Sequence, residues 1–207
     1  MLDSILIVDD HAIVRDGLRR MLATVHAVEV IEAANGRDAL ALARQERPDL
    51  VILDLNLPGL GGLELISRLL LDDRTRRILV LSMHAEPLYA ARALDAGAIG
   101  YLSKNASPDE LLEAVRKVAS GGRYVEADIA QAMAVGGAAE GEPIRRLSTR
   151  DLEILRLLAA GKSLAEIAEA LGVGYKTVAN TCTQIKTKLG LSRTADLVRF
   201  SIEMGVS

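Results

Sequence analysis

The chain has 207 residues, half of them apolar, so it suits two domains and can bury a sizeable core. Aromatic residues make up only 2%, which disfavours base-stacking modes of nucleic-acid binding, and the single cysteine, Cys182, excludes an internal disulfide and a cysteine zinc site. Residues 1–122 carry 14 basic and 18 acidic residues, whereas residues 143–207 carry 10 and 6, so the first part suits cation chemistry and the last a polyanion.

Apolar spacing in the first part predicts strands that alternate with helices. Strands are expected at 4–8, 27–33, 50–54, 77–82 and 99–103, and helices at 11–24, 36–45, 60–70, 87–96 and 108–120. Five such units predict a parallel sheet covered by helices on both faces. No apolar run approaches 18 residues and no signal peptide opens the chain, so we expect a cytoplasmic protein with no membrane partner.

The chain changes character after residue 120. Glycines, small residues and Pro143 predict a linker with one short helix near 127–135. Beyond it no strand pattern occurs, and helices are expected at 148–160, 163–171, 175–189 and 194–204. Ser148 and Asp151 form an acidic variant of a capping box at the first of these helices.

Carboxylates follow two of the predicted strands. Asp9 and Asp10 end the first strand, and Asp54 ends the buried run 50–53, before a loop rich in proline and glycine. If these strands are neighbours, three carboxylates converge and require a cation, and oxygen ligands suit Mg²⁺. The alternatives are that Asp54 only begins a turn and that Asp9 or Asp10 caps the next helix.

Two further strand ends carry groups that phosphoryl transfer requires. Ser82 supplies a hydroxyl and Lys104 an ammonium. An aspartate that forms an acyl phosphate needs a metal and a cation to offset charge on the phosphoryl oxygens. Each residue alone is most often a surface side chain, but together with the aspartates, at the ends of four strands, they indicate a site.

Residues 1–122 resemble the receiver domain of two-component response regulators, through Asp9-Asp10, Asp54, Ser82, Tyr101 and Lys104. The resemblance implies a flavodoxin-like (βα)5 fold with strand order 2-1-3-4-5. It also implies that Asp54 accepts a phosphoryl group from a sensor histidine kinase, and that Lys104 contacts this group. Asp10, Asp54 and the backbone carbonyl of Asn56 would hold Mg²⁺, with Asp9 acting through water, and Ser82 and Tyr101 would form the switch pair. The family often has proline after this lysine, where this chain has Asn105.

Residues 146–207 resemble the LuxR-type (NarL/FixJ-like) helix-turn-helix, a separate all-α domain of four helices, and residues 123–145 would be the linker. The resemblance rests on the segments 147–155, 161–168 and 171–173, and on Lys176-Thr177-Val178, which opens the expected recognition helix. The exposed side of such a helix reads the major groove. Its expected DNA contacts are Lys176, Thr177, Asn180, Thr181 and Gln184, with Lys186 and Lys188 at phosphates. For these two lysines a solvated helix face is the alternative, and Thr181 and Ala179 depart from the family pattern.

Together the two halves predict a phosphorylation-regulated transcription regulator, not an enzyme. Its partners would be a histidine kinase, double-stranded DNA and a second copy of the chain, in an active homodimer. One alternative keeps the DNA binding and makes the receiver a phosphorylation-independent interaction module. The other is an aspartyl-phosphate enzyme acting on a small molecule, although no substrate-specificity insert is visible.

Overall fold

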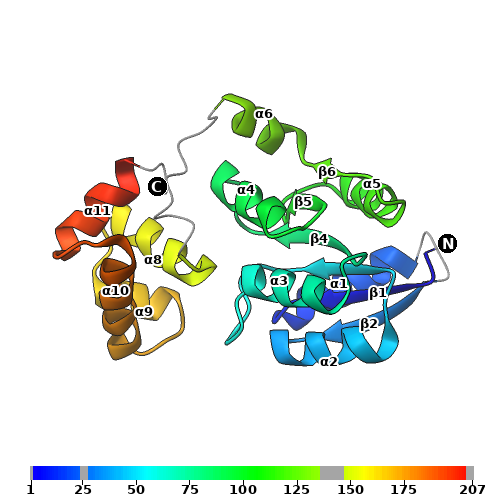
Figure 1. The fold of residues 1–207 in the computed structure, drawn as a ribbon, viewed down its shortest axis with the longest axis horizontal. Coiled ribbons are helices and arrows are strands. Elements are labelled where there is room, and N and C mark those ends of the chain that lie inside the picture. Colours follow the sequence, from blue (N-terminus) through cyan, green and yellow to red (C-terminus); the bar gives the residue numbers. More distant parts are fainter. Residues whose placement is uncertain (1, 24–27, 136–146, 204–207) are drawn as a thin grey trace. The chain divides into compact units, whose positions relative to one another are not determined.

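The structure is a computed structural model that describes residues 2–23, 28–135 and 147–203 (Figure 1). The chain divides into two compact units, Met1–Gly136 and Gly137–Ser207. The described residues contain no helix that is both long enough and apolar enough to cross a membrane.

The first unit is built on one parallel sheet in the order β2-β1-β3-β4-β5-β6. This order confirms the flavodoxin-like architecture and adds one strand at the edge. The sixth strand is too short to leave a pattern in the sequence. The strands are β1 (Ser4–Val8), β2 (Glu29–Ala33), β3 (Leu50–Leu53), β4 (Arg77–Ser82), β5 (Gly100–Ser103) and β6 (Tyr124–Val125).

The described residues of this unit form six helices, and the ends of these helices follow the local sequence. Asn35 caps the second helix by accepting a hydrogen bond from the Asp38 N–H, and Ser107 forms a capping box with Glu110 at the fifth. The helices are α1 (Ala12–Ala23), α2 (Gly36–Glu46), α3 (Gly62–Asp72), α4 (Pro87–Asp95), α5 (Pro108–Ala119) and α6 (Ala127–Val135).

Alternate strand residues face opposite sides of the sheet, so the buried strands contribute side chains to a hydrophobic core on each side. One cluster joins Ile5, Ile7 and Ile52 to Leu18 of α1 and Val115 of α5. Not every apolar residue of α1 faces the core, since Ile13 is 89% exposed. The helix buries Leu18 and Leu22 instead, one turn apart.

The second unit is all helical over residues 147–203, as predicted. Its helices are α8 (Thr149–Ala159), α9 (Leu164–Ala170), α10 (Tyr175–Leu189) and α11 (Thr194–Glu203). Ser148 with Asp151 and Ser163 with Glu166 form capping boxes at α8 and α9. Gly190 ends α10 with φ +68°, a left-handed conformation that favours glycine.

The expected linker, residues 123–145, starts within the first unit. Residues 124–135 form β6 and α6, and α6 packs against α4. Residues 136–146 lie outside the described part of the chain. The domain limits 1–122, 123–145 and 146–207 therefore remain a prediction.

Candidate functional site

Three carboxylates meet at the carboxyl edge of the sheet. Because β1 and β3 are neighbours, the residues that follow them lie side by side, and the Asp54 N–H donates to the Val8 carbonyl at 2.9 Å. Asp9 and Asp54 are 2% and 3% exposed, whereas Asp10 is exposed. One side-chain oxygen or nitrogen from each of Asp9, Asp10, His11 and Asp54 falls within 4.8 Å of the others. These residues therefore form one acidic cluster.

Lys104 lies between the two buried carboxylates. Its Nζ is 2.6 Å from Asp9 Oδ2 and 2.6 Å from Asp54 Oδ2. Its backbone N–H donates to the Ser82 carbonyl at 2.8 Å, which fixes the start of the loop after β5. Lys104 thus supplies positive charge that two crowded carboxylates require.

The charges of this group shift one another. Burial raises the pKa of Asp54, and the Lys104 ammonium offsets part of that shift. For Lys104, burial works against the charged form, but the carboxylates of Asp54 and Asp9 outweigh it and raise the pKa. Asp54 Oδ1 also accepts the Asn56 N–H at 3.2 Å.

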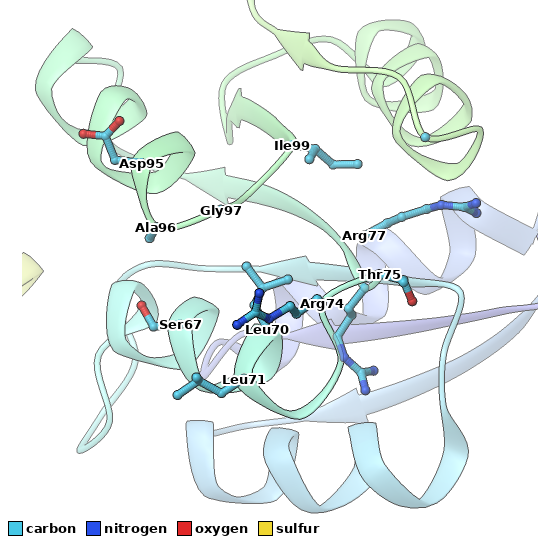
Figure 2. A pocket seen from close by; sticks show the side chains of 12 residues that line it. Ser67, Leu70, Leu71, Arg74, Thr75, Arg77, Asp95, Ala96, Gly97 and Ile99 are labelled. Carbon is cyan, nitrogen blue, oxygen red and sulfur yellow. The ribbon is translucent and has the colours of Figure 1, made fainter.

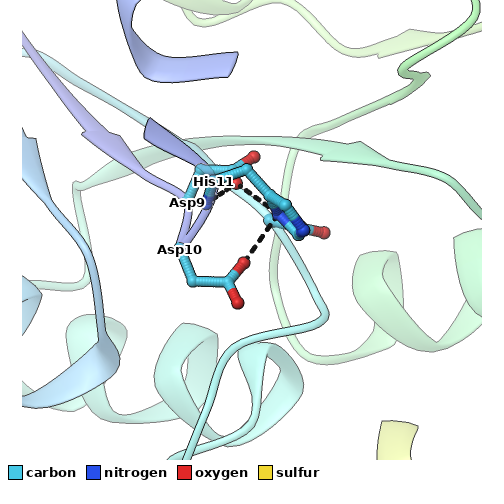
Figure 3. A group of neighbouring side chains, drawn as sticks. Asp9, Asp10 and His11 are labelled. Atoms are coloured by element: carbon cyan, nitrogen blue, oxygen red, sulfur yellow. Dashed lines mark hydrogen bonds and ion pairs between the residues drawn. The ribbon is translucent and has the colours of Figure 1, made fainter. Parts of the chain in front are cut away.

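His11 belongs to the acidic cluster although the sequence analysis did not select it. Its Nδ1 is 3.1 Å from Asp9 Oδ1 and 2.8 Å from Asp10 Oδ1 (Figure 3). Its backbone N–H donates to Asp9 Oδ1 at 2.8 Å. Its position directly after Asp10 was the available signal.

The residues expected to form a switch pair lie around a third residue, His84. The His84 N–H donates to Ser82 Oγ at 3.2 Å, and the Tyr101 hydroxyl donates to the His84 carbonyl at 2.6 Å. Burial raises the pKa of Tyr101, whose ring is fully enclosed. Tyr101 of the expected switch pair is therefore buried in this structure.

His84 also joins the loop after β3 to α4. Its ring nitrogen Nε2 is 3.1 Å from Asn56 Nδ2, and the ring stacks on Tyr89 at 4.0 Å between centroids. Sequence reasoning missed His84, because a lone histidine two residues beyond Ser82 gives no pattern by itself. The side chain of Asn56 therefore has a structural partner beside the acidic cluster.

The glycine-rich loop after Asp54 approaches its own backbone closely. A Cβ at Gly62 would lie 2.5 Å from Leu55 Cα and 2.8 Å from the Asp54 carbonyl oxygen. Only glycine fits there without moving the backbone. Gly62 thereby lets α3 begin directly against the backbone of Asp54 and Leu55.

A separate cavity of about 710 Å³ lies at the opposite edge of the sheet (Figure 2). Its lining includes Leu70 of α3, Arg77 at the start of β4, and Gly97 and Ile99 before β5. The carboxylates and Lys104 follow the carboxyl ends of the strands, so the cavity belongs to another part of the unit.

In the second unit, α10 divides into a buried and an exposed side. Val178, Cys182 and Ile185 are buried. Burial raises the pKa of the Cys182 thiol, as suits a packing residue. The expected DNA-contacting residues are exposed at Lys176, Thr177, Asn180 and Gln184, and half-buried at Thr181, Lys186 and Lys188.

Lys188 differs from the other expected contacts because it forms an ion pair within the unit. Its Nζ donates to Asp151 Oδ2, and Asp151 is 2% exposed. The same carboxylate oxygen accepts the Ser148 N–H at 2.8 Å. Lys188 therefore ties the last turn of α10 to the first turn of α8.

Comparison with known proteins agrees with both units. Residues 5–116 match the response regulator receiver domain, and residues 145–201 match the bacterial regulatory proteins of the luxR family. The response regulator UvrY of Escherichia coli K12 is 36% identical, over 98% of this chain and 95% of UvrY.

Two solved structures of RcsB resemble the whole chain. One is RcsB from Salmonella enterica serovar Typhimurium bound to the promoter P1flhDC in the presence of the phosphomimetic BeF₃⁻, with TM-score 0.62 and 26% identity over 97% of this chain and 98% of that one. The other holds two RcsB dimers bound to two parallel DNAs, with TM-score 0.62 and 25% identity over the same shares. The chain belongs to the two-component response regulators that join a receiver domain to a LuxR-type DNA-binding domain.

Proposed function

We propose that Asp54 accepts a phosphoryl group from a sensor histidine kinase, and that this reaction regulates DNA binding by the second unit. The observation that carries the proposal is the position of Lys104, whose ammonium lies between the buried carboxylates of Asp9 and Asp54. A buried aspartate with a fixed cation at the edge of a sheet is the arrangement that an acyl phosphate requires.

The acidic cluster fits a Mg²⁺ ion by the chemistry of its donors. Carboxylate oxygens of Asp10 and Asp54, with the backbone carbonyl of Asn56, would hold the ion, and Asp9 would act through water. When bound, Mg²⁺ offsets charge on the phosphoryl oxygens and orients them toward the acceptor. His11 beside Asp10 helps to place that carboxylate.

The side chains divide the remaining work. An Asp54 oxygen attacks the phosphorus, so a P–O bond forms while the P–N bond to the imidazole of the donor breaks. Lys104 then exchanges its contact with Asp54 for one with a phosphoryl oxygen. The Ser82 hydroxyl donates a hydrogen bond to another phosphoryl oxygen.

We infer that the switch operates through the segment 82–84. Ser82 Oγ now accepts the His84 N–H, and the His84 carbonyl accepts the Tyr101 hydroxyl. When the Ser82 hydroxyl moves to contact a phosphoryl group, the hydrogen bond from the His84 N–H to Ser82 Oγ must change. His84 would then shift relative to Tyr101 and α4. The surface formed by α4 and β5 would change accordingly.

DNA binding is proposed for the exposed side of α10. The side chains that would enter the major groove, where amide side chains pair with adenine, are those of Lys176, Thr177, Asn180, Thr181 and Gln184. Lys186 would meet phosphate, and Lys188 would do so only if it leaves Asp151. The dimers described for RcsB support a homodimer that reads two half-sites about 10 base pairs apart.

The test is phosphorylation by phosphoramidate with Mg²⁺, followed by intact-mass measurement and by affinity for a captured genomic DNA fragment. Wild type should gain one phosphoryl group and bind DNA more tightly, and Asp54→Ala should do neither. Asp38→Ala, which changes an exposed aspartate at the start of α2, is the matched control. Equal labelling and equal DNA affinity of wild type and Asp54→Ala would refute the proposal.

The alternative of a phosphorylation-independent receiver keeps the DNA binding. The complete set of Asp9, Asp54, Ser82 and Lys104 speaks against it, because such a receiver would not need these residues. DNA affinity that never responds to labelling would favour it. Sustained turnover of small phosphoesters would favour the aspartyl-phosphate enzyme instead.

A further inference from the structure

The segment after α5 folds back onto the outer edge of β5. β6 pairs with β5 in parallel, with Gly100 opposite Tyr124 and Tyr101 opposite Val125. The Glu126 N–H then donates to the Tyr101 carbonyl at 3.2 Å. Residues 124–126 therefore follow the strand that carries the proposed switch tyrosine.

The side chain of Glu126 extends this contact to the last residue of β5. Its Oε2 accepts the backbone N–H of Ser103 at 2.7 Å, and Ser103 is buried. The next residue along the chain is Lys104. A carboxylate that accepts a backbone N–H makes a strong, charge-assisted hydrogen bond. Glu126 is therefore held firmly at Ser103, the residue before Lys104, whose ammonium contacts Asp54.

Glu126 also lies directly before α6. Its carbonyl accepts the Ala130 N–H at 2.9 Å, the first bond of that helix. Its carboxylate is directed to Ser103 and not to the N–H groups of its own helix. One residue therefore joins the loop at Lys104 to the start of α6.

α6 also contacts the opposite side of the proposed switch. It packs against α4, and its residue Ile129 is 2% exposed. α4 carries Tyr89, on which His84 stacks. Figure 1 shows α6 beside α4 at the β6 end of the first unit. α6 is thus linked to α4, which the movement of Ser82 would displace, and through Glu126 to the loop that the movement of Lys104 would displace.

We propose that Glu126 is a positioning residue that couples phosphorylation of Asp54 to the position of α6. The inference rests on the proposed function, in which Lys104 exchanges Asp54 for a phosphoryl oxygen. That exchange shifts the backbone at Ser103 and Lys104, and the hydrogen bond from Ser103 transmits the shift to Glu126. α6 responds because Glu126 is its first hydrogen-bonded residue.

The test is hydrogen exchange of the full chain, measured by mass spectrometry with and without beryllofluoride and Mg²⁺. In wild type, beryllofluoride should change exchange both in the site loops (residues 82–86 and 103–107) and in α6. In Glu126→Ala the α6 amides should exchange about tenfold faster without beryllofluoride, because a charge-assisted bond is lost. They should no longer respond to beryllofluoride, while the site loops still respond.

Two variants separate coupling from mere packing. Glu126→Gln retains an oxygen acceptor and should restore most of the α6 response. Glu113→Ala removes an exposed glutamate of α5 and should behave as wild type. Both should melt at the wild-type temperature within about 2 °C.

The remaining outcomes distinguish this inference from the function on which it rests. If Glu126→Ala keeps the wild-type α6 response, or loses the response of the site loops as well, the coupling role is refuted. If wild-type loops respond and α6 does not, the inference fails and the proposed function stands. If neither responds in wild type, the proposed function fails and the inference with it.

Discussion

The ammonium of Lys104 lies 2.6 Å from a carboxylate oxygen of Asp54, although fifty positions separate the two residues in the chain. It makes an equal contact with Asp9. Lys104 and a divalent cation would therefore both offset the charge of Asp54, the cation by direct contact, and that of Asp9, the cation through water. Under the proposed function, Lys104 would compete with the metal before phosphorylation and contact the phosphoryl group after it.

Replacing Lys104 by methionine should tighten Mg²⁺ binding and slow phosphorylation. The change removes a positive charge next to two ligands, so Mg²⁺ affinity should rise by about tenfold or more. Labelling by phosphoramidate should fall by about 100-fold, because no fixed cation then meets the phosphoryl oxygens. Isothermal titration with MgCl₂ measures the first effect and intact mass the second.

The same variant should lose stability in the absence of Mg²⁺. Two buried carboxylates left without their cation should lower the free energy of unfolding by about 3 kcal/mol, and saturating Mg²⁺ should recover much of it. Lys117→Met, which changes the lysine of α5, is the control for loss of charge. Mg²⁺ affinity equal to that of wild type in Lys104→Met would show that the two cations do not compete.

Replacing Gly62 by alanine should disturb the loop that carries Asp54. The added Cβ would lie 2.5 Å from Leu55 Cα, and its close neighbours are all backbone atoms, so the loop or α3 must move. We expect a loss of about 2 kcal/mol in the free energy of unfolding and slower labelling of Asp54. Urea unfolding and the phosphoramidate assay measure these effects.

Gly61→Ala is the matched control for that change. Gly61 has a φ of −64°, and nothing lies within 4 Å of its added Cβ. Its cost should stay below about 1 kcal/mol, the scale of replacing a helix N-cap. Equal effects at the two glycines would mean that the contact between Gly62 and Leu55 does not position the loop.

Residues that belong to regular, buried elements were predictable from the sequence. The apolar runs of β1 and β3 end directly before Asp9 and Asp54, and parallel neighbours place those ends together. The family resemblance added the strand order, and the sheet has it. The convergence of the carboxylates therefore follows from periodicity and topology.

Contacts made by single residues across long separations were not predictable. β6 has two residues and pairs only because the edge of β5 is open, so no alternation reveals it. The enclosed position of Tyr101 depends on a backbone carbonyl of His84. Neither contact leaves a period in the sequence, and both became visible only once the sheet was assembled.

Replacing Asp49 by asparagine should flatten the acid limb of the stability curve. Asp49 Oδ2 accepts the N–H groups of Asp3 and Ser4 at 2.8 and 3.0 Å, and these bonds, the one from Asp3 first, hold the pKa of Asp49 below its ordinary value of 3.8. A lowered pKa stabilises the fold above the ordinary value, and this stabilisation is lost as the pH falls through the folded-state pKa.

The free energy of unfolding of wild type should therefore exceed that of Asp49→Asn by about 1 kcal/mol at pH 6, allowing for the partial exposure of the carboxylate. The difference should shrink as the pH falls below about 4. Urea unfolding between pH 3 and pH 6 measures it, with Glu113→Gln as the control. A difference that stays constant over this range would contradict the account of the Asp49 pKa.

Replacement of Lys176 by alanine should weaken DNA binding without loss of stability, whereas replacement of Lys188 by alanine should lower stability. Lys176 is exposed near the start of α10, so its loss should leave stability unchanged and remove one positive charge from the proposed DNA-binding side of the helix. The slope of log affinity against log salt, measured with random-sequence duplex DNA, should become shallower by about 0.9. Lys188 pairs with buried Asp151, so its loss should destabilise the second unit by about 2 kcal/mol.

The salt slope separates these roles because it counts released counterions and is insensitive to packing. Lys188→Ala should keep the wild-type slope at temperatures where the second unit remains folded, since the ammonium is already neutralised by Asp151. Lys188→Arg, which can still pair with a carboxylate, should recover part of the lost stability. If Lys188→Ala lowers the slope as much as Lys176→Ala while the melting temperature is unchanged, then Lys188 contacts DNA directly and its bond to Asp151 opens on binding.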